Sequence, residues 1–432
     1  SSLPIARLEG ERGRTTGQLR MFAAVVREGR WRDIRIETAL PDRAPLPRVD
    51  LRNQKVAIGP VAVFGSSNFP LAFSVAGGDT ASAWAAGCPV VVKAHPAHPG
   101  TSELVGRAIQ RAIQKTGVPE GIFSMIHGRN EIGIQLVQHP AIQAVGFTGS
   151  RQGGDALVRA ANARPVPIPV FAEMGSVNPI FFFPEAVRQY PELDAQYAAS
   201  LTLGAGQFCT NPGLLFVVAD EAGRELVDRL KAIIGQAGSQ PMLTEGIAAA
   251  YRTGCGALAQ HRLALAPDSA TGHARPHLAT VTSGEFRSDP RLHAELFGPA
   301  GIIVMCQDTA EFASLARELE GQLTATLWTT EVEQSRAQDL LLALTAKAGR
   351  VIVNGFPTGV EVGEAMQHGG PYPATSDPRF TSVGTGAIAR WARPVCYQSV
   401  PDSMLPAELQ DANPLGLVRR VNGVDTKDSV VR

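Results

Sequence analysis

Short apolar runs and longer amphipathic stretches alternate along the first half of the chain. From residue 60 onward, the runs are rich in Val, Ala, Ile and Phe, and most end near a glycine. They predict buried strands at residues 60–65, 89–94, 122–128, 144–150 and 169–175. The stretches between them predict helices at residues 69–87, 101–117, 129–138 and 151–163, with Thr101 and Gly117 as candidate caps of the second helix. This alternation is typical of a parallel, doubly wound α/β sheet.

The second half repeats the theme less regularly. Apolar runs predict four further strands, at residues 214–219, 300–306, 324–330 and 349–355, and therefore a second α/β domain. Ahead of the first sheet, the pattern predicts a helix over residues 14–28. Residues 34–57 interleave Val, Ile and Leu with prolines, which indicates a two-stranded exposed arm. The sequence after Trp391 is polar and predicts an irregular tail.

Composition narrows the class of protein. The chain has 432 residues, of which 44% are hydrophobic, so it can bury a large core and is not a disordered chain. Its 40 basic and 40 acidic residues leave no basic excess, which argues against a nucleic-acid partner. No apolar run is long enough to span a membrane. Five cysteines without a CxxC pair, and no signal-peptide pattern, indicate a reducing compartment, and we expect a cytoplasmic protein.

Four residues at predicted strand ends or in a glycine-rich turn are candidates for catalysis or ligand binding. Ligands of such sheets bind where the strands end, which draws attention to Asn68, Lys93 and Glu173. Each also has an ordinary interpretation, as a turn residue, a solvated strand end and a strand terminus, respectively. Cys209 lies in GAGQFCTNPG. A cysteine is more often a small buried apolar residue, but a thiolate in such a turn can attack a carbonyl group.

Other candidate sites are weaker. His95 and His98 form an HxxH pair with no partner ligand at a recognisable spacing, so we expect no metal site. The chain contains neither a GxGxxG nor a P-loop motif. Gly149 and Ser150 precede a predicted helix, whose N-terminal N–H groups would suit a phosphate.

Seven motifs occur in an order that resembles the NAD(P)-dependent aldehyde dehydrogenase superfamily, over about residues 15–395. They are Asn68 in GSSNFP, Lys93 in VVVKAHP, FTGS at 147–150, Glu173 in EMG, Cys209 in GQFCT, ELFGP at 295–299 and Asn354 in VNG. The resemblance implies two doubly wound α/β domains and a small β oligomerisation arm. The cofactor-binding domain would be 1–33 and 58–175, the catalytic domain 176–390, and the oligomerisation segments 34–57 and 391–432.

The resemblance also implies roles. Cys209 would be the nucleophile, Asn68 and the Cys209 N–H the oxyanion hole, and Glu173 the base that activates water. Glu295 and Phe297 would hold the nicotinamide end of the cofactor. The implied cofactor-binding positions are Phe64, Ser66, Lys93, His95, Pro96, Gly128, Arg129, Gly149, Ser150, Gly153, Met174, Gly175, Glu295 and Phe297.

Departures from the family pattern refine the expectation. NAD-preferring members often carry Glu where this chain has Pro96. Without that carboxylate a 2′-phosphate is tolerated, so we expect NADP, with NAD possible and His95 or Arg129 as phosphate partners. EMGSVNP and VVVKAHPAHPGTS resemble the branch that contains 2-oxoglutarate semialdehyde dehydrogenase and bacterial fatty aldehyde dehydrogenase. The family usually has more chain before the Asn68 motif.

We therefore expect oxidation of 2-oxoglutarate semialdehyde, with a medium- or long-chain aldehyde as the alternative substrate. The expected pocket is formed by Phe69, Phe73, Phe208, Thr210 and Pro357. No arginine adjoins Asn68 or Cys209 in sequence, so neutral donors would hold a substrate carboxylate, namely Thr210, Asn211 or Thr358. Glu173 disfavours an acylating reaction with coenzyme A, and the intact motifs disfavour a catalytically silent structural protein. We expect a homodimer or homotetramer.

Overall fold

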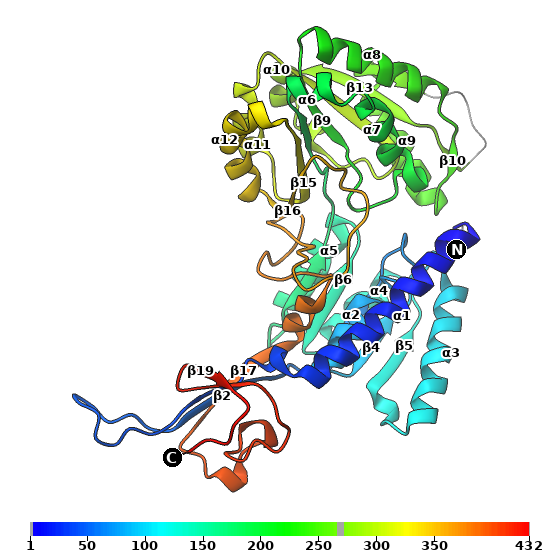
Figure 1. The fold of residues 1–432 in the computed structure, drawn as a ribbon. Helices are drawn as coiled ribbons and strands as arrows, with labels where there is room; N and C mark the ends of the chain where they lie inside the picture. Colours follow the sequence, from blue (N-terminus) through cyan, green and yellow to red (C-terminus); the bar gives the residue numbers. More distant parts are fainter. Residues whose placement is uncertain (1–2, 266–271, 432) are drawn as a thin grey trace.

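The computed structural model describes residues 3–265 and 272–431. Figure 1 shows three parts: two α/β units, each built on its own sheet, and a smaller β part that carries the C-terminus. The expected architecture, with parallel sheets wound by helices on both faces, is confirmed. None of the helices within the described residues has both the length and the apolar character needed to cross a membrane.

The first sheet is parallel throughout and has the order β5-β4-β3-β6-β7. Its strands are β3 (Val61–Phe64), β4 (Val90–Lys93), β5 (Phe123–Ile126), β6 (Ala144–Thr148) and β7 (Val170–Glu173), as the apolar runs predict. The chain turns in opposite directions on either side of β3, so the carboxyl ends of β3 and β6 flank the position where ligands bind in such sheets.

Helices cover both faces of this sheet. They are α1 (Ile5–Glu28), α2 (Gly78–Ala86), α3 (Pro99–Thr116), α4 (Asn130–Gln138) and α5 (Arg151–Asn162). One core cluster joins α1, α2 and α3 to the strands, and a second joins α4 and α5 to the opposite face. Gly117 ends α3 in a left-handed conformation, as expected, but His98 and not Thr101 occupies the N-cap position.

The helix expected over residues 69–87 begins only at Gly78, so its first half was predicted wrongly. The backbone N–H groups of Leu71 and Ala72 donate to the Glu11 carboxylate at 3.1 and 3.3 Å. The Gln18 side chain donates to the Ala72 carbonyl at 3.3 Å. Because α1 engages these backbone groups, residues 69–77 form turns beside the helix instead of extending it.

The second sheet has the order β11-β13-β14-β9-β8-β15-β16, with only β11 antiparallel to its neighbour among the described pairings. Its strands are β8 (Ile180–Phe182), β9 (Leu214–Val218), β11 (Arg262–Leu265), β13 (His277–Thr282), β14 (Ala300–Cys306), β15 (Gln322–Trp328) and β16 (Ala348–Val353). Its helices are α6 (Pro184–Gln189), α7 (Leu193–Thr202), α8 (Glu221–Gln236), α9 (Glu245–Ala257), α10 (Ser283–Ser288), α11 (Ala310–Glu318) and α12 (Gln334–Thr345). The pattern did not predict β8, β11 or β13.

The third sheet joins the expected arm to the C-terminal tail in the order β17-β2-β1-β18-β19. Its strands are β1 (Arg35–Glu37), β2 (Leu51–Ala57), β17 (Ala392–Gln398), β18 (Arg419–Val421) and β19 (Val424–Thr426). The tail is therefore not irregular, because β17 pairs with β2 over seven residues. Between β1 and β2, residues 38–50 project away from the rest of the molecule (Figure 1). A short pair, β10 (Gln240–Pro241) and β12 (His273–Ala274), lies apart from these sheets.

Candidate active site

Cys209 follows a strained turn at the end of α7. Gly204, Ala205 and Gly206 all have left-handed backbone conformations, with φ of 54°, 59° and 63°. A Cβ atom on Gly206 would lie 2.3 Å from the Gly298 backbone, so only glycine fits there. The Asn178 amide donates to the Cys209 carbonyl at 2.9 Å. The turn and this hydrogen bond fix the backbone that carries the thiol.

The thiol faces a buried histidine and a buried carboxylate. His368 Nε2 lies 3.5 Å from Cys209 Sγ and 3.0 Å from Glu173 Oε1. One ligand atom from each of these three side chains lies within 4.8 Å of the other two. Such a set also suits a soft divalent metal ion, which would compete with any carbonyl group for the thiol. Ser382 donates to the other Glu173 oxygen.

These contacts set the protonation of the two acidic groups. Burial alone raises the pKa of Glu173, but His368 and the Ser382 hydroxyl together bring it below its ordinary value. Burial and the Glu173 charge raise the pKa of the Cys209 thiol well above its ordinary value, while Arg14 acts in the opposite direction. At neutral pH the site therefore holds a protonated thiol beside an ionised carboxylate, which is a nucleophile next to a base.

Asn68 lies beside the turn that carries Cys209. Its side chain is buried, and its Nδ2 donates to the Gln207 carbonyl at 2.9 Å. Gln207 is two residues before Cys209, so the Asn68 amide lies beside the turn that carries the nucleophile, as an oxyanion-hole donor would have to.

Lys93 and Ser150 lie at or just past the carboxyl ends of β4 and β6. Burial lowers the pKa of Lys93. Ser150 caps α5 by accepting from Gly153 N at 3.2 Å. Burial, with the nearby charges of His98 and Lys93, lowers the pKa of His95 to about 4, so at neutral pH this imidazole carries no charge to offer a phosphate. Arg129 is exposed at the start of α4.

The remaining predicted cofactor positions divide into three groups. Phe64 and Met174 are buried in the core cluster under α4 and α5, so their side chains do not face a ligand. The Ser66 carbonyl accepts from His98 at 2.9 Å. A Cβ atom on Gly128, Gly149 or Gly175 would lie 2.6 Å or less from a side chain of this protein, while Pro96 is exposed.

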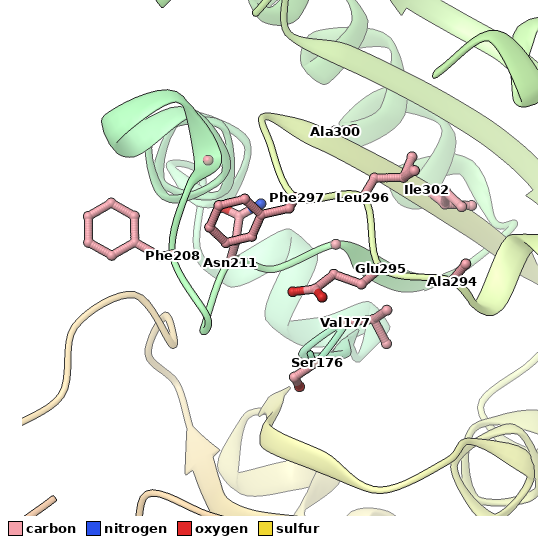
Figure 2. A pocket seen from close by; sticks show the side chains of 12 residues that line it. Ser176, Val177, Phe208, Asn211, Ala294, Glu295, Leu296, Phe297, Ala300 and Ile302 are labelled. Carbon is pink, nitrogen blue, oxygen red and sulfur yellow. The ribbon is translucent and has the colours of Figure 1, made fainter. Parts of the chain in front are cut away.

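Glu295 and Phe297 line a small pocket, which Figure 2 shows from close by. The two side chains project from one loop, and Phe208, Asn211 and Ser176 lie around them. A Cβ on Gly175 would lie 2.2 Å from Glu295 Oε2, so the bare backbone leaves space for the carboxylate. The Glu295 side chain is exposed to solvent. The resemblance implies that these two residues hold the nicotinamide end of a cofactor, and this stays a prediction.

Aromatic rings define the substrate side. Phe69 packs edge-to-face on Phe73 and on Phe208, with ring centroids 5.2 and 5.7 Å apart. Thr210 is only 1% exposed, and Pro357 is buried with its carbonyl bound to Arg350. The pocket expected from sequence therefore contains three clustered rings, whereas Thr210 and Pro357 lie behind its surface.

Two arginines of α1 cover these rings, which the sequence did not predict. The Arg7 guanidinium lies 4.6 Å from the centroids of both Phe69 and Phe208. The Arg14 guanidinium lies 4.9 Å from the centroid of Phe73. Beside Phe22, the buried face of this helix contains Glu11, Thr15 and Gln18, so the hydrophobic pattern predicted a helix but not its contact with the rings. His368 was also missed, and its position in HGG within an irregular segment offered no local signal.

Comparisons with known proteins agree with this geometry. The sequence model described as the aldehyde dehydrogenase family matches residues 2–372. Alpha-ketoglutaric semialdehyde dehydrogenase 2 of Azospirillum brasilense is 56% identical over 98% of this chain and 82% of its own length. Alpha-ketoglutaric semialdehyde dehydrogenase of Acinetobacter baylyi is 51% identical over 99% of this chain and 82% of its own length.

The fold is also that of solved structures. Glyceraldehyde-3-phosphate dehydrogenase GapN from Methanocaldococcus jannaschii, complexed with NADP, superposes with a TM-score of 0.74 at 19% identity. The match covers 91% of this chain and 82% of that one. At this identity, the likeness concerns the fold alone.

Proposed function

Because this chain belongs to the aldehyde dehydrogenase family, and is therefore an aldehyde-oxidising oxidoreductase, we propose that it converts 2-oxoglutarate semialdehyde to 2-oxoglutarate with NADP. The observation that carries the proposal is the Cys209 thiol within reach of the Glu173 carboxylate and His368. Two relatives named for this semialdehyde are more than half identical over nearly the whole chain, which supports the substrate assignment.

The first step is the addition of Cys209 to the aldehyde. Its thiol proton passes to Glu173, and the sulfur forms a bond to the carbonyl carbon. The carbonyl π electrons move to oxygen, where the Asn68 amide and the Cys209 N–H stabilise the negative charge. His368 donates from Nε2 to Glu173 and so keeps the carboxylate turned toward the sulfur.

The nicotinamide cofactor, when bound, supplies the acceptor for the hydride that leaves the same carbon. The residues present fit it: Glu295 and Phe297 face an open pocket, and Lys93 and Ser150 lie near strand ends of the first sheet. Pro96 places no carboxylate near an adenosine ribose, which favours NADP over NAD. His95 is uncharged at neutral pH, so Arg129 is the better of the two phosphate partners.

Loss of the hydride leaves Cys209 acylated as a thioester. Glu173 first releases the thiol proton to solvent and then removes a proton from water, which attacks the thioester carbon. The carbon–sulfur bond breaks, the product leaves as a carboxylate, and the sulfur regains a proton. A carboxylate with a lowered pKa is ionised at neutral pH and can serve in both steps. This base favours hydrolysis over transfer of the acyl group to coenzyme A.

We also propose a cytoplasmic homo-oligomer. No disulfide joins the five cysteines, which all lie in the described part of the chain, and this suits a reducing compartment. The arm at residues 38–50 exposes Leu40, Leu46 and Val49, which suits contact with a second copy. A mass of two or four chains in light scattering is expected, and a monomeric mass would contradict the assembly.

A second candidate substrate is a medium- or long-chain aldehyde, which the ring cluster of Phe69, Phe73 and Phe208 favours. Initial rates for the semialdehyde and for a medium-chain alkanal, each with NADP and with NAD, separate the two. We expect the highest kcat/KM for the semialdehyde with NADP. A higher kcat/KM for the alkanal would overturn the proposed substrate.

A further inference from the structure

Three arginines from distant parts of the chain gather near the nucleophile. Arg7 and Arg14 come from α1, and Arg350 comes from β16. The charges of Arg14 and Arg350 interact with the Cys209 sulfur, and Arg14 also interacts with Glu173. The sequence placed no arginine beside Asn68 or Cys209, because these three are distant from both in the chain.

Two of the three guanidinium groups already have partners. Arg7 pairs with the Glu11 carboxylate at 3.3 Å and donates to the Asn68 carbonyl at 3.3 Å. Arg350 donates to the carbonyls of Pro357 and Gly359 at 2.6 and 3.0 Å. These contacts hold both groups against protein loops through two nitrogen atoms each, although Arg350 Nε is buried without a partner among the described residues.

Arg14 is different. Its Nε and Nη2 atoms are buried, and neither has a hydrogen-bond partner. The Phe73 and Phe69 rings lie 4.9 and 5.9 Å from the guanidinium, and an aromatic face cannot replace a hydrogen-bond acceptor. Burying charged donors without acceptors is costly, so an acceptor from outside the chain would stabilise this arrangement.

The two unpartnered atoms lie on the same edge of the guanidinium. That edge presents two parallel N–H groups, which match the two oxygens of a carboxylate in a bidentate pair. The neutral donors expected from sequence are less suited to this role. Thr358 is bound to Ser200, and the Asn211 amide donates to the Gly298 carbonyl.

We propose that Arg14 binds the carboxylate at the far end of the substrate, through Nε and Nη2, while Cys209 attacks the aldehyde end. This inference rests on the proposed function, since it requires an aldehyde that carries a carboxylate. The phenylalanine rings then line the short carbon chain between the two ends. Selection for a semialdehyde over an alkanal is therefore assigned to one residue of α1.

Arg14 also favours the thiolate of Cys209 through its charge, and the test must separate this effect from substrate binding. A change in thiol ionisation alters the rates for all aldehydes alike. Loss of a carboxylate partner affects only the acidic substrate. The informative quantity is thus the ratio of kcat/KM for the semialdehyde to kcat/KM for pentanal, which has the same number of carbons.

The experiment measures this ratio in the wild type and in Arg14→Met, Arg14→Lys and Arg12→Met. Arg12 is an exposed arginine on the same helix, two residues away, and serves as the matched control. We expect the ratio to fall about 100-fold in Arg14→Met, mainly through KM for the semialdehyde. Arg14→Lys keeps the charge but loses the bidentate edge, so a fall of about tenfold is expected. Arg12→Met should match the wild type.

The outcomes distinguish the inference from the function on which it rests. A wild type that prefers pentanal would overturn the proposed substrate. A wild type that prefers the semialdehyde, with equal losses for both substrates in Arg14→Met, would overturn only the role of Arg14. If Arg14→Met does not fold, an unchanged ratio in Arg14→Lys contradicts the inference, and a reduced ratio supports it.

Discussion

The reacting side and the substrate side of the site are built in opposite ways. Around Cys209, the polar groups are mostly paired: Glu173 with His368 and Ser382, and Asn68 with the Gln207 carbonyl. On the substrate side, Arg14 lies against phenylalanine rings with two donors unpaired. The paired side is fixed before any ligand arrives, whereas the unpaired side becomes complete only when an anion binds. Chemistry and selectivity are thus assigned to different parts of the chain.

Removing the nucleophile should have the largest effect. We expect Cys209→Ala to reduce aldehyde oxidation by about 10⁴-fold or more, because no thioester can form. Binding of NADP, measured by fluorescence titration, should persist, since none of the expected cofactor contacts is a Cys209 side-chain contact. Appreciable oxidation by this variant would contradict the assignment of Cys209.

Replacing the base should slow hydrolysis of the thioester more than its formation. We expect Glu173→Gln to lower steady-state turnover about 100-fold, because water then lacks its proton acceptor. A burst of reduced cofactor should remain in stopped-flow traces. The thiol also loses Glu173 as its proton acceptor, but loss of the Glu173 charge lowers the pKa of Cys209, so the thiol can instead ionise to solvent.

Alkylation of the thiol checks this reason independently. In the wild type, the raised pKa of Cys209 means that the alkylation rate should increase about tenfold per pH unit between pH 7 and 9. In Glu173→Gln the same curve should move to lower pH. A burst lost to the same extent as turnover, with an unshifted alkylation curve, would mean that Glu173 has only a structural role.

Replacing His368 should have a smaller effect on activity than replacing Glu173. The effect should appear in the pH dependence of kcat/KM. His368 helps to lower the pKa of Glu173, and without it burial would raise that pKa. We therefore expect the acid limb of the kcat/KM profile to move to higher pH in His368→Leu, so that activity is lost at a pH where the wild type still works. An unshifted limb with a uniformly lower rate would contradict this positioning role.

The two sides also differ in how far sequence could predict them. Cys209, Glu173 and Asn68 lie in motifs at strand ends or tight turns, so local pattern made them candidates, and the resemblance carried by seven motifs gave them their expected roles. All five strands of the first sheet were predicted as well. Met174 also adjoins a strand end, but its side chain is buried in the core. Position in a motif does not fix the direction of a side chain.

The substrate side depends on contacts between distant segments. Arg14 lies at the start of the helix predicted over residues 14–28, but the buried face beside it is polar, with Glu11, Thr15 and Gln18, so the pattern did not indicate what this face contacts. The same polar face binds the backbone of Leu71 and Ala72, which is why the helix expected from residue 69 starts at Gly78. His368 approaches Glu173 from 195 residues away. Local pattern carries no information about such approaches.

The most direct test of the account is to identify the covalent intermediate. The enzyme is mixed with 2-oxoglutarate semialdehyde and NADP, quenched with acid during the burst, and analysed by peptide mass spectrometry. The account predicts that the peptide containing Cys209 gains one acyl group derived from the substrate, and that the other four cysteines gain none. Reduced cofactor formed without acylation of Cys209, or with the acyl group on another cysteine, would contradict it.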